Sequence, residues 1–171
     1  MGLFPPGKGG GDDVDYGYKG KGVTNHLLVE GKGMPLSAIT TSAKGSERAQ
    51  VINLLAEVKV FGPTRFRPRS CPKELQADKG YDSQELRNTL RAKGIKPCIS
   101  RRAWKNRKQR PGRKPPEQKD RFKVERCFAW IQRKFRRLCI RWERRRRYWN
   151  GFLQLAIAWM WAGKIENLLY G

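Results

Sequence analysis

The sequence predicts an α/β fold in which one mixed β-sheet is flanked by helices. Short runs of β-branched and aliphatic residues alternate with longer runs whose apolar residues recur every three or four positions. An early pair of short apolar runs is separated by a glycine-containing turn, which is typical of a β-hairpin. The chain has 171 residues, of which 38% are hydrophobic and 11% aromatic. This is enough for one domain over residues 1–171 with a buried core.

The first 22 residues are predicted to form a loop, because repeated glycines disfavour a stable helix. Their glycine-rich run lacks the Gly-Lys-Ser/Thr ending of a phosphate-binding loop and a preceding strand. A glycine-rich turn that leads into a strand is therefore the preferred interpretation. Three acids of this stretch are interpreted as solvated loop residues: Asp12, Asp13 and Asp15.

A β-hairpin is predicted next, with strands over 23–29 and 34–41 and a turn between them. His26 lies inside the first strand and has no adjacent acidic or cysteine residue. We therefore interpret it as a packed strand residue rather than as a ligand or a base.

Helices and strands then alternate as far as residue 100. Serine caps and a glycine stop mark the helix ends, and short apolar runs mark the strands. The predicted elements are a helix over 46–58 capped by Ser46, a loop over 61–72, a strand over 74–77, a helix over 83–93 ended by Gly94, and a strand over 95–100.

The chain is strongly basic, with 38 Lys and Arg against 15 Asp and Glu and a formal net charge of +23. Of these basic residues, 21 lie between Arg101 and Arg147. Such a concentrated charge indicates a polyanionic partner, most commonly nucleic acid, and binding that depends steeply on salt. Residues 101–119 have no apolar periodicity and are predicted to form a mobile basic loop. Trp104 in this loop is placed either to stack on a base or to pack on the domain.

A helix is predicted over residues 121–138, with one apolar face and basic residues around it. The apolar face consists of Val124, Phe128, Ile131, Phe135 and Leu138. Glu125 is a carboxylate within this basic helix. Two interpretations stay open: ion pairing with Arg121 or Arg126, or a shared divalent-metal site with Asp78 at the end of a strand. Mg²⁺ prefers such oxygen ligands and could support phosphodiester cleavage.

The C-terminal part is predicted to contain a solvated basic run over 141–147 and a helix over about 148–169. Residues 152–161 are apolar but too few to span a bilayer, so we expect them to be buried. The four cysteines form no CxxC pair and are interpreted as reduced thiols. The N-terminal residues lack the apolar segment of a signal peptide. Together these features favour a cytoplasmic location without a membrane partner.

Three segments of the chain resemble insertion-sequence transposases of the DDE type (IS4-like or IS5-like). Ala77-Asp-Lys-Gly-Tyr-Asp-Ser83 resembles the motif around their second acid. The stretch 121–132, with Arg121 four residues before Glu125, is similar to their third-acid helix. The stretch 17–36 resembles the hairpin that follows their first acid. The three segments occur in the family's order and cover nearly the whole chain.

This resemblance implies an RNase H-like catalytic domain that binds transposon ends and target DNA, cuts them and joins them. Mg²⁺ or Mn²⁺ would be held by three carboxylates, of which Asp78 is the second and Glu125 the third. Arg121 would contact DNA or position Glu125. Paired subunits are a feature of transposition, so a homo-oligomer is expected. The further DNA-contacting candidates are Arg101, Arg102, Trp104, Lys105, Arg133, Lys134, Arg136 and Arg137.

The sequence departs from the family pattern at three places. Gln118 and Gln132 occupy positions where the family often has Tyr and Lys. Met1 stands at or near the place of the first acid. The resemblance therefore implies an N-terminally truncated copy with little or no cleavage activity. The alternative is a small basic nucleic-acid-binding protein without catalysis.

Overall fold

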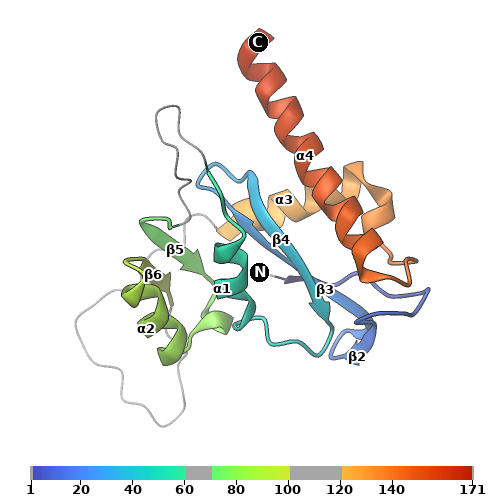
Figure 1. The fold of residues 1–171 in the computed structure, drawn as a ribbon, viewed down its shortest axis with the longest axis horizontal. Helices are drawn as coiled ribbons and strands as arrows, with labels where there is room; N and C mark the ends of the chain where they lie inside the picture. The colour runs from blue at the N-terminus through green and yellow to red at the C-terminus, as the bar shows by residue number, and fades with distance from the viewer. Residues whose placement is uncertain (1, 61–70, 101–120, 171) are drawn as a thin grey trace.

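The computed structural model describes residues 2–60, 71–100 and 121–170, and it confirms a mixed α/β fold (Figure 1). The strands are β1 (Gly2–Leu3), β2 (Asp15–Gly17), β3 (Gly20–Val29), β4 (Pro35–Ser42), β5 (Glu74–Ala77) and β6 (Lys96–Ile99). The helices are α1 (Gln50–Ala56), α2 (Gln84–Ala92), α3 (Arg121–Lys134) and α4 (Arg146–Tyr170), with 3₁₀ turns over Lys79–Tyr81 and Arg136–Leu138.

The first sheet is built around β3. The predicted hairpin is confirmed, because β4 pairs antiparallel with β3 along its length. β2 pairs with the beginning of β3 on the same edge as β4, and β1 pairs with the middle of β3 on the other edge. Residues 1–22 are therefore not all loop, as the sequence had suggested. Glycine makes this pairing possible at Gly22, where a Cβ would lie 2.4 Å from the carbonyl oxygen of Pro5.

The interpretation of these acids as solvated loop residues holds for Asp12, which is exposed in a turn, and is corrected for Asp13 and Asp15, which are partly buried. Asp15 lies in β2, accepts a hydrogen bond from Ser42 and pairs with Lys44 at 2.9 Å. The Lys44 ammonium lowers the pKa of this carboxyl. Asp12 and Asp13 instead contact the start of α4. The Asp12 carboxylate accepts from a backbone N–H at 3.1 Å, and Asp13 pairs with the Arg146 guanidinium at 3.1 Å.

The second sheet is a parallel pair, β5 and β6, which α2 connects. The predicted strands and helix of this unit are confirmed. Ser83 accepts a hydrogen bond from the Leu86 N–H and so begins α2. Gly94 follows the helix with a φ of +72°, a left-handed conformation that favours glycine. Among the described residues the two sheets share no ladder, so the single mixed sheet expected from the sequence is divided.

Helix α1 begins at Gln50 rather than at Ser46, so the predicted serine cap is wrong. The residue before the helix, Ala49, makes no side-chain cap. The preceding segment is held elsewhere. Glu47 accepts a hydrogen bond from the Tyr81 hydroxyl at 2.9 Å, and Arg48 donates to the Gly80 carbonyl at 2.7 Å. These two bonds hold Glu47 and Arg48 against the loop after β5, so these residues do not form the first turn of α1.

The predicted helix over 121–138 is divided into α3 and a 3₁₀ turn. Phe135 leaves helical geometry, with φ −121° and ψ 74°. The thiol of Cys139 reaches back to the Gln132 carbonyl and satisfies one acceptor at the end of α3. The predicted apolar face is confirmed. Phe128, Ile131 and Leu138 are buried, while Val124 and Phe135 are partly buried against the same core.

The segment after α3 is only partly the solvated run that its charge suggested. Arg141 is fully buried. Its backbone N–H donates to the Pro6 carbonyl at 2.8 Å, and its Nε donates to the Glu143 carbonyl at 2.9 Å. The backbone hydrogen bond to Pro6 places Arg141 in the interior, against the N-terminal segment. The four arginines that follow it, at 144–147, are exposed as expected.

Helix α4 is buried over only part of its length, so the prediction of a buried segment over 152–161 holds in part. Trp149, Leu153 and Ala156 are buried against the first sheet. Leu155 and Trp159 remain 66% exposed. The C-terminal half of α4 projects away from the rest of the chain (Figure 1). None of the described helices combines the length and apolar character needed to cross a membrane.

Candidate metal and nucleic-acid site

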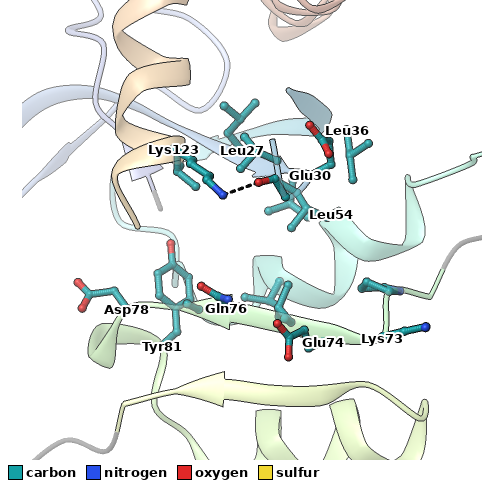
Figure 2. A pocket seen from close by; sticks show the side chains of 18 residues that line it. Leu27, Glu30, Leu36, Leu54, Lys73, Glu74, Gln76, Asp78, Tyr81 and Lys123 are labelled. Atoms are coloured by element: carbon teal, nitrogen blue, oxygen red, sulfur yellow. Dashed lines mark hydrogen bonds between the residues drawn. The ribbon is translucent and has the colours of Figure 1, made fainter. Parts of the chain in front are cut away.

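A cavity of about 410 Å³ lies where β3, α1, β5 and the first turn of α3 meet. Asp78 lies at one end of it, and Lys123 of α3 lies across from it (Figure 2). Eleven of the lining residues are apolar, which keeps water away from much of the wall. The cavity thus brings together two segments that are 45 positions apart in the sequence.

Asp78 is positioned by the end of β5. The strand stops at Ala77, and Asp78 keeps an extended conformation with ψ 159°. One carboxylate oxygen accepts a hydrogen bond from the Lys79 N–H at 2.7 Å and caps the following 3₁₀ turn. The side chain is half-buried at the rim of the cavity. This cap restricts the orientation of the carboxylate.

Tyr81 also lines the cavity, and its backbone N–H donates to the Asp78 carbonyl at 2.9 Å. Its ring is buried, and its hydroxyl donates to the Glu47 carboxylate at 2.9 Å. Burial, together with the negative charge of Glu47, raises the pKa of Tyr81, so the phenol stays protonated. Sequence reasoning missed this pair. The sequence offered one indication of the Tyr81–Glu47 pair, which is the aromatic residue three positions after Asp78.

The first turn of α3 is docked on the turn between β3 and β4. The Lys123 ammonium donates to the Gly31 carbonyl, and the Arg126 guanidinium donates to the Lys32 carbonyl at 3.4 Å. Gly33 allows this turn with a φ of +93°. Because two side chains hold the beginning of α3, the residues there have a defined position.

Glu125 therefore has a fixed backbone position beside the cavity. Its neighbours Lys123 and Val124 line the cavity, whereas Glu125 itself is exposed and does not. Within the described ranges, no group of three or more His, Cys, Asp or Glu side chains could hold a metal ion. The structure thus brings Asp78 close to the helix that carries Glu125.

The outer face of α3 carries an aromatic and basic stripe that sequence reasoning missed. Phe122, Arg126 and Trp130 follow one another at intervals of four positions and are exposed. The Arg126 guanidinium lies 5.6 Å from the Phe122 ring centre and 5.0 Å from that of Trp130. This geometry is that of cation–π contacts. The interval of four was visible in the sequence, but the surrounding charges obscured it.

The predicted DNA-contacting residues fall into three groups. Arg133 and Lys134 are exposed at the end of α3, and Arg136 is exposed in the 3₁₀ turn that follows it. Arg137 is engaged within the protein, since it pairs with Glu143 at 2.6 Å and lies 5.2 Å from a ring of α4. The remaining candidates lie outside the described residues or side chains: Arg101, Arg102, Trp104, Lys105 and Arg121.

Comparison with known proteins assigns the family. The family described as "Transposase DDE domain" matches residues 6–161. The chain belongs to this family. It is also 36% identical over 134 residues to a protein of Burkholderia cepacia named "Putative transposase for insertion sequence element IS402". The alignment covers 78% of the chain and 60% of that relative's length. No solved structure matches the chain.

Membership of the Transposase DDE domain family confirms the prediction made from the motifs around Asp78 and Glu125. Both residues lie inside the matched range. The family assignment concerns the chain as a whole. The roles of the individual side chains remain predictions.

Proposed function

We propose that this chain acts in DNA transposition as the RNase H-like catalytic region of an insertion-sequence transposase. One observation carries the proposal: within the family-matched range, Asp78 and the first turn of α3 line the same cavity. Two segments that carry the resemblance thus meet in space. The location expected for this role is the bacterial cytoplasm, next to the nucleoid.

In this proposal Asp78 and Glu125 supply oxygen ligands for Mg²⁺ or Mn²⁺. The residues fit in part, because carboxylates are the ligands that these ions prefer, and Asp78 is already oriented by its bond to Lys79. When bound, such an ion would polarise a phosphodiester and activate water. Lys123 contributes by fixing the start of the helix on the hairpin turn.

DNA would lie along the exposed face of α3. Arg133, Lys134 and Arg136 would neutralise phosphates there, and Arg121 would act nearer the metal site. Trp130, held by Arg126, would offer a ring for stacking on an unpaired base. The proposal also includes a homo-oligomer, in which paired chains hold the two transposon ends.

A non-catalytic nucleic-acid-binding protein is the second candidate. It is favoured by one observation, that the described residues contain no three-acid group. Both candidates share the basic face of α3, and they differ in whether Asp78 and Glu125 are needed for a reaction.

The test of the DNA-binding face is a salt titration with a fluorescent duplex. Removing one phosphate contact should reduce the slope of log affinity against log salt by about 0.9. Arg133→Gln should show this reduction, and Arg91→Gln, at an exposed site on α2, is the matched control with the same change of charge. Equal slopes for the two variants would contradict binding along α3.

Cleavage of the duplex with Mn²⁺ separates the two candidates. A transposase predicts nicking that Asp78→Asn and Glu125→Gln each abolish while duplex binding persists. A binding protein predicts no product from any variant. We expect binding to be weak and strongly salt-dependent and cleavage to be slow, because the described residues contain no group of three acids that could hold a metal ion.

A further inference from the structure

The short hairpin formed by β2 and the beginning of β3 carries two tyrosines and two lysines, and we call it the 16–21 hairpin. Tyr16 is 69% exposed and Tyr18 is fully exposed. Lys19 and Lys21 are exposed beside them. All four side chains lie outside the two hydrophobic core clusters of the described chain. The hairpin thus presents aromatic rings and cations together to a ligand.

The base of the hairpin is held firmly by the segment that follows β4. A Cβ on Gly17 would lie 2.5 Å from the Ala43 carbonyl oxygen, so β2 packs closely against this segment. Asp15, the first residue of β2, accepts a hydrogen bond from the Ser42 hydroxyl at 3.1 Å. Gly17 pairs with Gly20, whose φ of +106° favours glycine and closes a loop of two residues. Because the tip has a defined position, its binding of a ligand would cost little ordering.

The charge and the aromatic character of the hairpin favour nucleic acid as this ligand. The Lys21 ammonium lies 5.8 Å from the Tyr16 ring centre across the two strands, so cation and ring share one face. The nearest acid, Asp15, is paired with Lys44 at 2.9 Å. The hairpin therefore keeps a positive charge that suits phosphates. An exposed ring beside such cations can stack on an unpaired base of any sequence.

A second basic segment lies beside the chain that leads into the hairpin. Asp12, three residues before β2, donates its backbone N–H to the Arg144 carbonyl at 2.7 Å. Its carboxylate accepts from the Arg146 N–H at 3.1 Å. These two bonds fix the exposed arginines 144–147 near the base of the hairpin. Phosphates of a DNA strand that reaches the hairpin could therefore also contact these arginines.

The hairpin is distant from the cavity beside Asp78. Strand β3 connects the two places, because Gly20 belongs to the hairpin and Val29 lines the cavity. At about 3.3 Å per residue, the length of β3 corresponds to roughly 30 Å. Figure 1 shows β2 and the beginning of β3 on the opposite side of the molecule from β5 and β6. One duplex that reached both places would span about nine base pairs, at about 3.4 Å each.

We infer that the 16–21 hairpin binds unpaired bases of DNA. Tyr18 stacks on one base, and Lys19 and Lys21 contact the neighbouring phosphates. The preferred ligand is a duplex with a single-stranded end, because a base inside an intact stack offers no free face to an aromatic side chain. The inference rests on the proposed function, since it takes DNA as the ligand, and it adds a second DNA contact far from Asp78.

The probe is a fluorescently labelled duplex of about fifteen base pairs that ends in about six unpaired thymines. A blunt duplex of the same length is its control. Binding is measured by fluorescence polarisation without divalent metal, so no result depends on metal binding by Asp78 or Glu125. We expect the unchanged chain to bind the single-stranded end about fivefold or more tightly than the blunt duplex.

The two DNAs distinguish failure of this inference from failure of the proposed function. Equal affinity for both DNAs would overturn binding of unpaired bases and leave duplex binding along α3 intact. Binding of neither DNA would contradict the inference and the proposed function together.

The matched protein variants are Tyr18→Ala and Tyr18→Phe. Tyr18→Ala removes the ring at a fully exposed site and should weaken binding of the single-stranded end about tenfold, with the blunt duplex unaffected. Tyr18→Phe keeps the ring and should bind as the unchanged chain does. Tyr170→Ala, which removes another exposed tyrosine, is the control. Equal affinities of Tyr18→Ala and Tyr170→Ala for the single-stranded end would contradict the inference.

Fluorescence of 2-aminopurine in the single-stranded end reports the stacking itself, because stacking on another ring quenches this base. Saturating amounts of the unchanged chain should quench the fluorescence, and Tyr18→Ala at saturation should leave most of it. The double variant Lys19→Gln and Lys21→Gln should reach full quenching only at higher protein concentration. Full quenching by Tyr18→Ala would refute stacking on Tyr18, and an unchanged titration of the double variant would refute the phosphate contacts.

Discussion

Lowering the pH should destabilise the protein through His26. This imidazole is buried between β3 and β4, and its Nε2 lies 2.8 Å from the Thr41 hydroxyl oxygen. That hydroxyl donates to the Ser42 carbonyl, so the imidazole must donate through Nε2–H. A second proton would have to bind Nδ1. This atom is buried and has no hydrogen-bond partner among the described residues.

The magnitude follows from the pKa of His26 in the two states. Burial lowers this pKa to about 4 from its ordinary value of 6.5. The unfolded chain therefore binds more protons than the folded chain between these values, and stability falls as the pH falls through this window. Between about pH 7.5 and about pH 5 the loss should be about 2 kcal/mol in the free energy of unfolding.

Urea denaturation at three pH values measures this loss, with His26→Gln as the non-titrating control. Asp15 does not interfere. Its pKa is lowered from 3.8, so the stability it contributes is lost only below the window. His26→Gln should show a much smaller pH dependence than the unchanged chain. An equal pH dependence in both would refute the assignment of His26 as a buried neutral imidazole.

Two further predictions concern the fold. Arg141→Met should lower the free energy of unfolding by about 3 kcal/mol in urea denaturation, because it removes buried bonds to the segment before α4; a loss no larger than that of exposed Arg144→Met would contradict this role. Ser83→Ala should destabilise the protein by about 1 kcal/mol because it removes a helix cap. Ser46→Ala is the matched control and should have little effect, and equal losses for both serines would place the start of α1 at Ser46 after all.

Elements fixed by local chemistry could be predicted from the sequence. Ser83 and Gly94 mark the ends of α2 through bonds and dihedral angles of neighbouring residues, so the pattern was sufficient. The hairpin followed from its glycine-containing turn. Family resemblance added Asp78 and the third-acid helix, and the structure places that helix beside the same cavity as Asp78.

Elements fixed by distant contacts could not be predicted in this way. Arg141 is buried because it pairs with a segment 135 positions earlier, and its charge alone indicated exposure. The start of α1 depends on the Glu47–Tyr81 bond. The exposure of Leu155 on α4 depends on how much of that helix the first sheet can cover.

Mn²⁺ titration by electron paramagnetic resonance, with a short DNA duplex present, tests the central claim most directly. The claim is that Asp78 and Glu125 jointly bind the metal. Asp78→Asn and Glu125→Gln should each weaken Mn²⁺ binding by roughly tenfold or more, which corresponds to about 1.4 kcal/mol. Glu74→Gln is the control, because Glu74 lines the same cavity at the other end of β5. Unchanged Mn²⁺ affinity in both Asp78→Asn and Glu125→Gln would contradict the account.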